Sequence, residues 1–233
     1  MFLYDLPNLL SILILVIVSF RLGFIPLWLS FFLGLFAFTP FFLNNVLFSA
    51  GYMPDQFQYF HITQSIRSLD LEFYDSRAVE TASWMLALFP LPYIETIQSL
   101  GFFNRMLVTI LIIWLYKSKK LRGWPLLFII FYPSLLLYSS LALRDTLVLI
   151  FMIMAVIFFI ENRRLLALLI SLPLLFIKFQ NFFLIIVFFV AHLYFSRDSL
   201  FFRYRQIFLI LVIASLAPFL MTIIDILDYS RLN

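Results

Sequence analysis

The sequence contains no cysteine, only two histidines and only five glycines among its 233 residues. The absence of cysteine excludes disulfide bonds, zinc sites with cysteine ligands and thiol catalysis. The glycines are not grouped, so a glycine-rich phosphate-binding loop is also excluded. Neither an HExxH zinc motif nor a GxSxG nucleophile motif occurs. We therefore expect no cofactor, and a divalent metal is not indicated.

Charge is also scarce, because charged residues make up 12% of the chain and hydrophobic residues 64%. A soluble domain is nearer half apolar and a quarter charged. A soluble fold of this size could not bury so much apolar surface. The sequence therefore predicts an all-α polytopic membrane protein that forms a single transmembrane domain over residues 1–233. The net charge of +4 lies in short loops between apolar runs, so we expect no nucleic-acid partner.

The apolar runs predict about seven to eight transmembrane or re-entrant helices, because a bilayer core requires about 20 helical residues and several runs are shorter. One long polar stretch, residues 50–80, separates the second run from the third. The expected runs are Leu6–Phe20, Phe24–Phe48, Thr81–Tyr93, Phe102–Tyr116, Trp124–Leu143, Thr146–Ile160, Leu165–Ile177, Phe182–Phe195 and Ile207–Leu227.

Basic residues predict the orientation, because Lys and Arg are enriched in cytoplasmic loops. A cytoplasmic Lys117–Arg122 loop places most basic residues inside and most acidic residues outside. This fit requires an N-terminus outside the membrane, and it requires Thr81–Tyr93 to be re-entrant or interfacial. Membrane lipids are then the surrounding partner.

The polar stretch contains a predicted amphipathic helix at Pro54–Leu69. Tyr59, Ile62, Ile66 and Leu69 are spaced as one apolar stripe on a helix. A helix of this kind lies in the plane of the membrane interface, here on the outer face.

The predicted topology collects polar residues from three separate segments at the outer face. Charged groups near or within a bilayer are energetically unfavourable, and they tend to be paired or functional. The candidate catalytic residues are Asp55, Arg144 and Asp145. The candidate substrate-binding residues are Gln58, His61, Arg67, Lys178, Gln180 and Asn181.

Each of these candidates also has a structural interpretation. Asp55 and Asp145 are of a type favoured at helix starts, so each could serve as a cap. Arg144 could extend to lipid headgroups, and His61 could be a solvated surface residue. Lys178 favours a functional interpretation, because a simple turn between two spans would prefer Gly, Pro or Asn.

Three short segments carry a family resemblance. Residues 133–147, PSLLLYSSLALRDTL, resemble a P-S-x-x-x-x-S-x-x-x-R-[DQE]-x-[LI] segment of bacterial membrane glycan polymerases of the Wzy and EpsG-like type and of related GT-C glycosyltransferases. Residues 177–181, IKFQN, resemble their basic-x-Gln/His segment. Residues 54–59, PDQFQY, resemble their first-loop Asp…Tyr motif. Two predicted spans precede this loop, which favours the polymerase branch of the family.

The resemblance implies an enzyme that uses polyprenyl-phosphate or polyprenyl-pyrophosphate sugars at the outer face of a bacterial inner membrane. It implies that Asp55 is the acidic catalytic residue and that Arg144 and Lys178 bind phosphate. Such proteins are normally longer than this chain, so a continuation beyond the C-terminus is expected. A non-enzymatic membrane subunit or lipid-binding scaffold is the alternative. A transporter fits less well, because no internal repeat is found.

Overall fold

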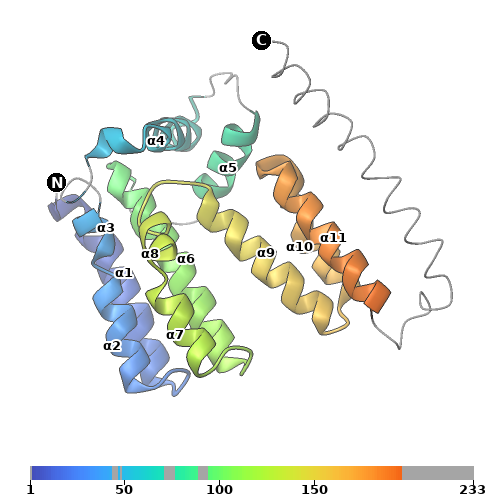
Figure 1. Cartoon of the computed structure of the whole chain (residues 1–233). Coiled ribbons are helices and arrows are strands. Elements are labelled where there is room, and N and C mark those ends of the chain that lie inside the picture. The colour runs from blue at the N-terminus through green and yellow to red at the C-terminus, as the bar shows by residue number, and fades with distance from the viewer. Residues whose placement is uncertain (1, 44–46, 48, 71–76, 89–93, 196–233) are drawn as a thin grey trace, which may run out of the picture. The chain divides into compact units, whose positions relative to one another are not determined.

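The computed structural model describes residues 2–43, 47, 49–70, 77–88 and 94–195. Within these residues every regular element is a helix, which confirms the predicted all-α class (Figure 1). The expected run Ile207–Leu227 lies outside the described residues. The chain divides into two compact units, the first formed by Met1–Ile153 with Phe176–Lys178. The prediction of one transmembrane domain over the whole chain stays a prediction.

The first unit is built around two long apolar helices, α1 (Phe2–Arg21) and α6 (Ile97–Lys117). Thr96 and Ser99 form a reciprocal capping box that begins α6. The fully buried Asp5 accepts hydrogen bonds from the Thr96 hydroxyl and the Ser99 hydroxyl, both at 2.6 Å. A carboxylate at a helix N-terminus also complements the helix dipole. Asp5 therefore fastens the start of α1 to the start of α6.

Only α1 and α6 are long and apolar enough, within the described residues, to cross a membrane by length and composition. The other apolar helices are shorter, and the predicted number of seven to eight spans is not supported by these lengths. The apolar core of the first unit lies between α1, α2, α6 and α7. Its buried members include Ile12, Val16, Leu29, Leu33, Val108, Ile112, Leu126 and Ile130.

Two runs that the sequence predicts as single spans are broken, so the prediction of continuous helices was wrong there. Run 24–48 forms α2 (Leu27–Phe36) and α3 (Thr39–Leu43). Run 124–143 forms α7 (Trp124–Phe131) and α8 (Pro133–Tyr138). Tyr132 has an extended backbone, with ψ of 113°, because a residue before proline avoids the helical region. After α8 the chain continues as the non-helical segment 139–144, named here the site loop.

The polar stretch contains α4 (Asp55–Arg67), as predicted, and it packs on α5 (Arg77–Leu88). The 3₁₀ helix η1 (Ala50–Tyr52) precedes α4. Tyr59, Ile62 and Ile66 are buried, which confirms most of the predicted stripe. Leu69 does not belong to it, because it follows the helix end with a positive φ of 60° and is 82% exposed. Residues 89–93 of the predicted re-entrant run lie outside the described part.

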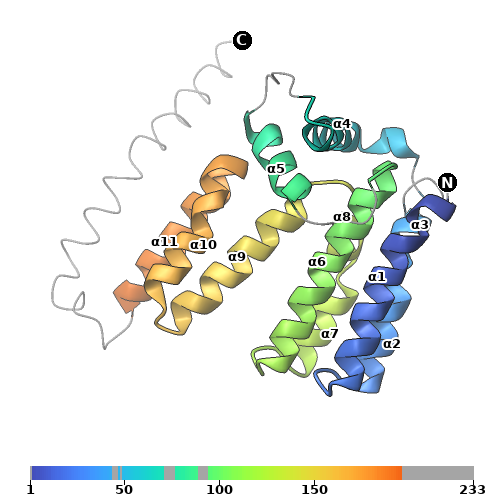
Figure 2. The same ribbon diagram turned by 180° about the vertical axis from the view of Figure 1, so that it is seen from behind.

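The second unit, in its described part, comprises Met154–Leu175 and residues 179–195. It contains the end of α9 (Asp145–Ile160), most of α10 (Arg164–Ile177) and α11 (Phe179–Phe195). The rings of Phe159 and Phe189 stack at 4.0 Å between centroids, and His192 meets Phe159 edge-on. A helix break at Lys178 is observed as expected, because Lys178 alone separates α10 from α11, but Gln180 and Asn181 belong to α11 and not to the turn; the hairpin itself stays a prediction. Figure 2 shows the same elements from behind.

Candidate functional site

The site loop, 139–144, is buried over most of its length although its backbone is irregular. An irregular segment in apolar surroundings must have its polar backbone groups satisfied by other parts of the protein. Asn104, buried on α6, donates from Nδ2 to the Leu141 carbonyl at 2.7 Å and to the Leu143 carbonyl at 2.8 Å. From α4, the buried Gln56 accepts from the Ala142 N–H at 3.2 Å. Two helices far apart in sequence thus fix the backbone of this loop.

Gly101 fixes the approach of α6 to the same loop. A Cβ atom at this position would meet the Ser140 carbonyl oxygen and its carbon, at 3.0 Å from the carbon. Only glycine therefore permits this contact between helix and loop. The Ser140 hydroxyl lies 2.7 Å from the Thr39 hydroxyl, which connects the loop to α3 as well.

Arg105 is a buried cation that holds the start of the loop. Its Nε donates to the Phe36 carbonyl at 3.0 Å, and its NH1 donates to the Ser139 hydroxyl at 2.9 Å. Phe36 is the last residue of α2, and Ser139 is the C-cap of α8. The carbonyl at the C-terminal end of α2 and the Ser139 hydroxyl therefore solvate the guanidinium, which has no carboxylate partner among the described residues. The Phe36 ring adds a cation–π contact, with the guanidinium carbon 5.4 Å from the ring centroid.

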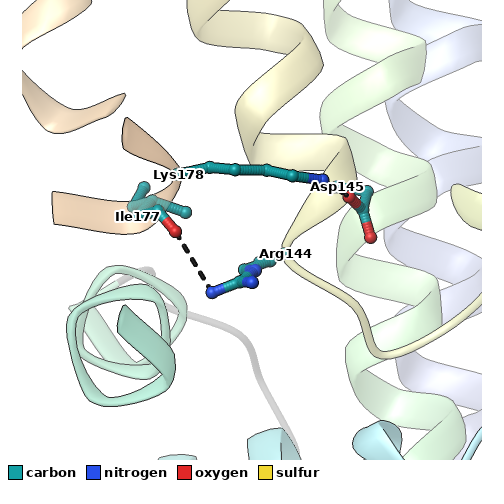
Figure 3. A network of polar contacts seen from close by, with 4 residues as sticks. All are labelled: Arg144, Asp145, Ile177 and Lys178. Carbon is teal, nitrogen blue, oxygen red and sulfur yellow. Dashed lines mark hydrogen bonds and ion pairs between the residues drawn. The ribbon is translucent and has the colours of Figure 1, made fainter. Parts of the chain in front are cut away.

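The fixed loop presents Arg144 and Asp145 at the start of α9 (Figure 3). Lys178 extends toward Asp145, and its Nζ lies 3.0 Å from Oδ1 in an ion pair whose side chains are 34% and 41% exposed. Arg144 donates from NH1 to the Ile177 carbonyl at 3.1 Å. Ile177 is the last residue of α10, so Arg144 also neutralises a helix C-terminus. Three of the predicted site residues are therefore neighbours.

Asp55 lies one helical turn before Tyr59 on α4. Burial raises the pKa of Tyr59 to about 12; the Arg144 charge lowers it, and the Asp145 and Asp55 carboxylates raise it. All three predicted catalytic residues therefore act electrostatically on one buried phenol. Asp55 is the first residue of α4 and is exposed. The N-cap residue of α4 is Pro54, which makes no side-chain cap, so Asp55 is not the N-cap of this helix.

An apolar cavity of about 330 Å³ begins at Asp145. Leu135, Leu149 and Ile153 provide apolar walls from α8 and α9, and Thr146 lies beside Asp145. The volume is within the range of small-ligand sites. The cavity can accept an apolar chain, and the one charged residue among the described residues of its lining is Asp145, which pairs with Lys178. Its lining residues are Phe128, Ile129, Tyr132, Ser134, Leu135, Tyr138, Asp145, Thr146, Leu149 and Ile153.

The remaining candidates are less closely connected with this cluster. Gln58 and His61 are exposed on α4. Arg67, at the end of α4, donates from Nε to the Ala87 carbonyl at 3.3 Å, so it supports the contact between α4 and α5. Gln180 and Asn181 lie in the first turn of α11, in the second unit.

Sequence reasoning missed Asn104 and Arg105 as the groups that position the loop. The signal was present, because both are polar residues inside the apolar run Phe102–Tyr116, where a charge is unfavourable. Their partners could not be identified, since they bond to backbone carbonyls of segments far away in the sequence. Among the residues that the structure describes, no three His, Asp or Glu side chains gather as a metal site.

Comparison of the chain with family models, with curated proteins and with solved structures finds no match.

Proposed function

We propose that this chain is a membrane glycosyltransferase or glycan polymerase that acts on polyprenyl-phosphate- or polyprenyl-pyrophosphate-linked sugars. One observation carries the proposal: Asp145 lines an apolar cavity and pairs with Lys178, and Arg144 precedes Asp145 and bonds to Ile177, the neighbour of Lys178. A lipid phosphate has the same two parts, an apolar chain and an anionic head. The cations can pair with the anionic head, and the apolar cavity lets the chain leave water.

The proposal includes a location in a bacterial inner membrane, with the N-terminus outside. The shorter apolar helices then complete seven to eight transmembrane or re-entrant segments, and α4 lies in the outer interface. The cation-rich turns after α1 and α6 support this orientation, because basic loops stay in the cytoplasm. A chain without cysteine allows a direct test with introduced cysteines. We expect Ser68→Cys to react with an impermeant thiol reagent on intact cells and Ser118→Cys to be shielded; the reverse pattern would refute the orientation.

In the proposed reaction an acceptor hydroxyl attacks the anomeric carbon of the donor sugar, and the bond from that carbon to the phosphate oxygen breaks. Asp55, which is exposed, takes the proton of the hydroxyl. Arg144 and Lys178 stabilise the charge that develops on the departing phosphate. The Lys178–Asp145 pair is partly exposed, so exchanging the carboxylate for a phosphate requires little energy.

Arg144 is suited to this role because it uses one donor of its guanidinium fork within the described residues. The other donors can bind two phosphate oxygens at once, which a lysine cannot do. Arg144→Lys should therefore lower the turnover by roughly a hundredfold, which corresponds to about 3 kcal/mol of transition-state stabilisation. Asp55→Asn should abolish turnover.

The test is transfer of a labelled sugar from a polyprenyl-linked donor by the purified chain in lipid vesicles. Arg164→Lys and Asp70→Asn are matched controls, because Arg164 and Asp70 are exposed and lie outside the proposed site. We expect both controls to keep the wild-type rate. Wild-type rates for both Arg144→Lys and Asp55→Asn, at equal protein level, would refute the assigned roles.

A specific observation favours a second candidate, a non-enzymatic membrane subunit. Arg144 and Lys178 each bind a protein group, the Ile177 carbonyl and the Asp145 carboxylate. If these contacts are purely structural, Lys178→Met should lower the melting temperature in detergent. Binding of a polyprenyl phosphate to the wild-type chain should then be absent. Saturable binding that Lys178→Met weakens would instead support the transferase.

A further inference from the structure

The turn after α1 and the turn after α6 form one strongly basic end of the first unit (Figures 1 and 2). Arg21 ends α1, Lys117 ends α6, and Lys119, Lys120 and Arg122 follow. The sequence has no Asp or Glu between residues 6 and 54 or between 96 and 144. These two segments therefore contribute five cations to this end and no carboxylate.

Aromatic rings hold three of these cations in fixed positions. Lys117 Nζ lies 3.4 Å from the centroid of the Phe24 ring, Lys120 Nζ lies 5.1 Å from Trp114, and the Arg122 guanidinium lies 5.7 Å from Tyr116. A ring contact restrains a long side chain and leaves the charge able to bind an anion on its other side. The Lys117–Phe24 contact also joins the two turns.

Tryptophan marks the same end of the molecule. Three of the four tryptophans, Trp28, Trp114 and Trp124, lie close to these two loops in the sequence. Trp124 is 84% exposed, and Leu27, beside Trp28, is 68% exposed. Exposed tryptophan and apolar side chains beside cations are typical of the boundary between headgroups and hydrocarbon.

We propose that this basic–aromatic end binds the headgroups of anionic phospholipids. The phosphodiester would lie against Lys117, Lys120 and Arg122, and the acyl chains would run along Leu27 and Trp124. The binding site is separate from the proposed catalytic residues Asp55, Arg144 and Lys178. Lys117 ends α6, whereas Asn104, which holds the site loop, lies in the first half of this helix. The rise of an α-helix places the two residues roughly 20 Å apart along its axis. The proposal therefore holds whether or not the chain is a transferase.

The apolar surroundings distinguish a lipid from other anions. Free phosphate would use the cations but would gain nothing from exposed Trp124 and Leu27. The turn between α9 and α10 provides a contrast. It also carries two adjacent cations, Arg163 and Arg164, but neither has a cation–π contact with a described residue, and Glu161 lies nearby in the sequence.

The test is binding of phosphatidylglycerol to the full chain in mild detergent, followed by native mass spectrometry, with phosphatidylcholine as the neutral lipid. We expect phosphatidylglycerol to bind more tightly. Lys117→Gln/Lys120→Gln/Arg122→Gln should weaken its binding by roughly a hundredfold, since each cation contributes about fivefold. Arg163→Gln/Arg164→Gln should change it less than about threefold, because these two cations have no ring contact with a described residue and no exposed tryptophan beside them in the sequence.

Ring removal gives a second, charge-neutral test. Phe24→Leu/Tyr116→Leu keeps every cation, and we expect roughly tenfold weaker binding of phosphatidylglycerol. Equal binding of the two lipids by the wild-type chain would overturn the proposal. So would an equal loss in the Arg163/Arg164 control. Full competition by inorganic phosphate at the same concentration would overturn it in favour of a free-anion site.

Discussion

Two loops of the first unit have similar lengths but are stabilised by different means. The site loop, 139–144, is mostly buried, and its backbone bonds to Gln56 and Asn104 from other helices. The loop after α6 is largely exposed and is held mainly by local hydrogen bonds. Ser118, Lys119 and Lys120 donate their N–H groups to carbonyls in the last turn of α6. The first conformation therefore depends on tertiary contacts, and the second on local ones. Substitutions that remove a contact of the first loop should accordingly lower the free energy of unfolding strongly, and those in the second loop should lower it little.

The largest expected effect is that of Gly101→Ala. A Cβ atom would collide with the backbone of Ser140, which cannot move without breaking the bonds of the site loop. We expect a loss of about 3 kcal/mol in the free energy of unfolding, at the upper end of overpacking effects. Thermal unfolding in detergent measures it. Gly34→Ala is the control, because its Cβ would meet only Leu13 at 3.9 Å, and equal losses in both variants would contradict the role of Gly101.

Removal of the Asn104 side chain should have the next largest effect. Asn104→Ala removes one hydrogen bond from each of the Leu141 and Leu143 carbonyls, of which Leu141 keeps the Leu143 N–H at 2.9 Å. This should lower the free energy of unfolding by about 2–3 kcal/mol. Ser118→Ala is the comparison in the exposed loop, because the Ser118 hydroxyl donates only to carbonyls of the preceding helical turn. A surface substitution of this kind should change the free energy of unfolding by about 0.5 kcal/mol at most. Similar melting temperatures for the two variants would remove the distinction between the loops.

The pKa of the Tyr59 phenol responds to burial and to the charges of Arg144, Asp145 and Asp55. Its pKa is raised to about 12, mainly by burial, so the neutral form is favoured in the folded state. Below about pH 10 the phenol is neutral in both the folded and the unfolded chain. As the pH rises from about 10 toward 12, the unfolded chain loses this proton first, and the free energy of unfolding falls by about 2–3 kcal/mol. Stability measured against pH should show this loss in the wild-type chain. Tyr59→Phe should lack this component, and an unchanged profile would contradict the assignment.

The smallest expected effect concerns the Asp145–Lys178 ion pair. Both side chains are at least one-third exposed, so solvent screens their attraction. A double-mutant cycle with Asp145→Asn and Lys178→Met should give a coupling energy of about 0.5–1 kcal/mol. A coupling above about 2 kcal/mol would show that the pair is a structural clamp, because exposed pairs do not reach this value, and it would favour the non-enzymatic alternative.

Periodicity predicted α4 well, because an amphipathic stripe is a local property of the sequence. It failed for the runs 24–48 and 124–143, where composition alone suggested continuous helices. Pro133 carried a signal for the second break, since it forces Tyr132 into an extended conformation. Pro40 carried a signal for the break between α2 and α3, since proline has no N–H to donate to the Phe36 carbonyl four residues earlier. What the sequence did not show is that this carbonyl accepts from Arg105, a contact that exists only in the folded chain.

The sequence by itself determined the helical class, the start of α9 to within one residue and the helix break at Lys178, since these depend on composition and local preference. It also predicted that Arg144, Asp145 and Lys178 lie at the same end of the helices, because successive apolar runs alternate in direction. Only the tertiary structure decided that Lys178 pairs with Asp145, that Arg144 bonds to Ile177 and that Asn104 and Arg105 hold the site loop. These contacts join residues that are far apart in the sequence, and their geometry depends on how the helices pack, which no local pattern encodes.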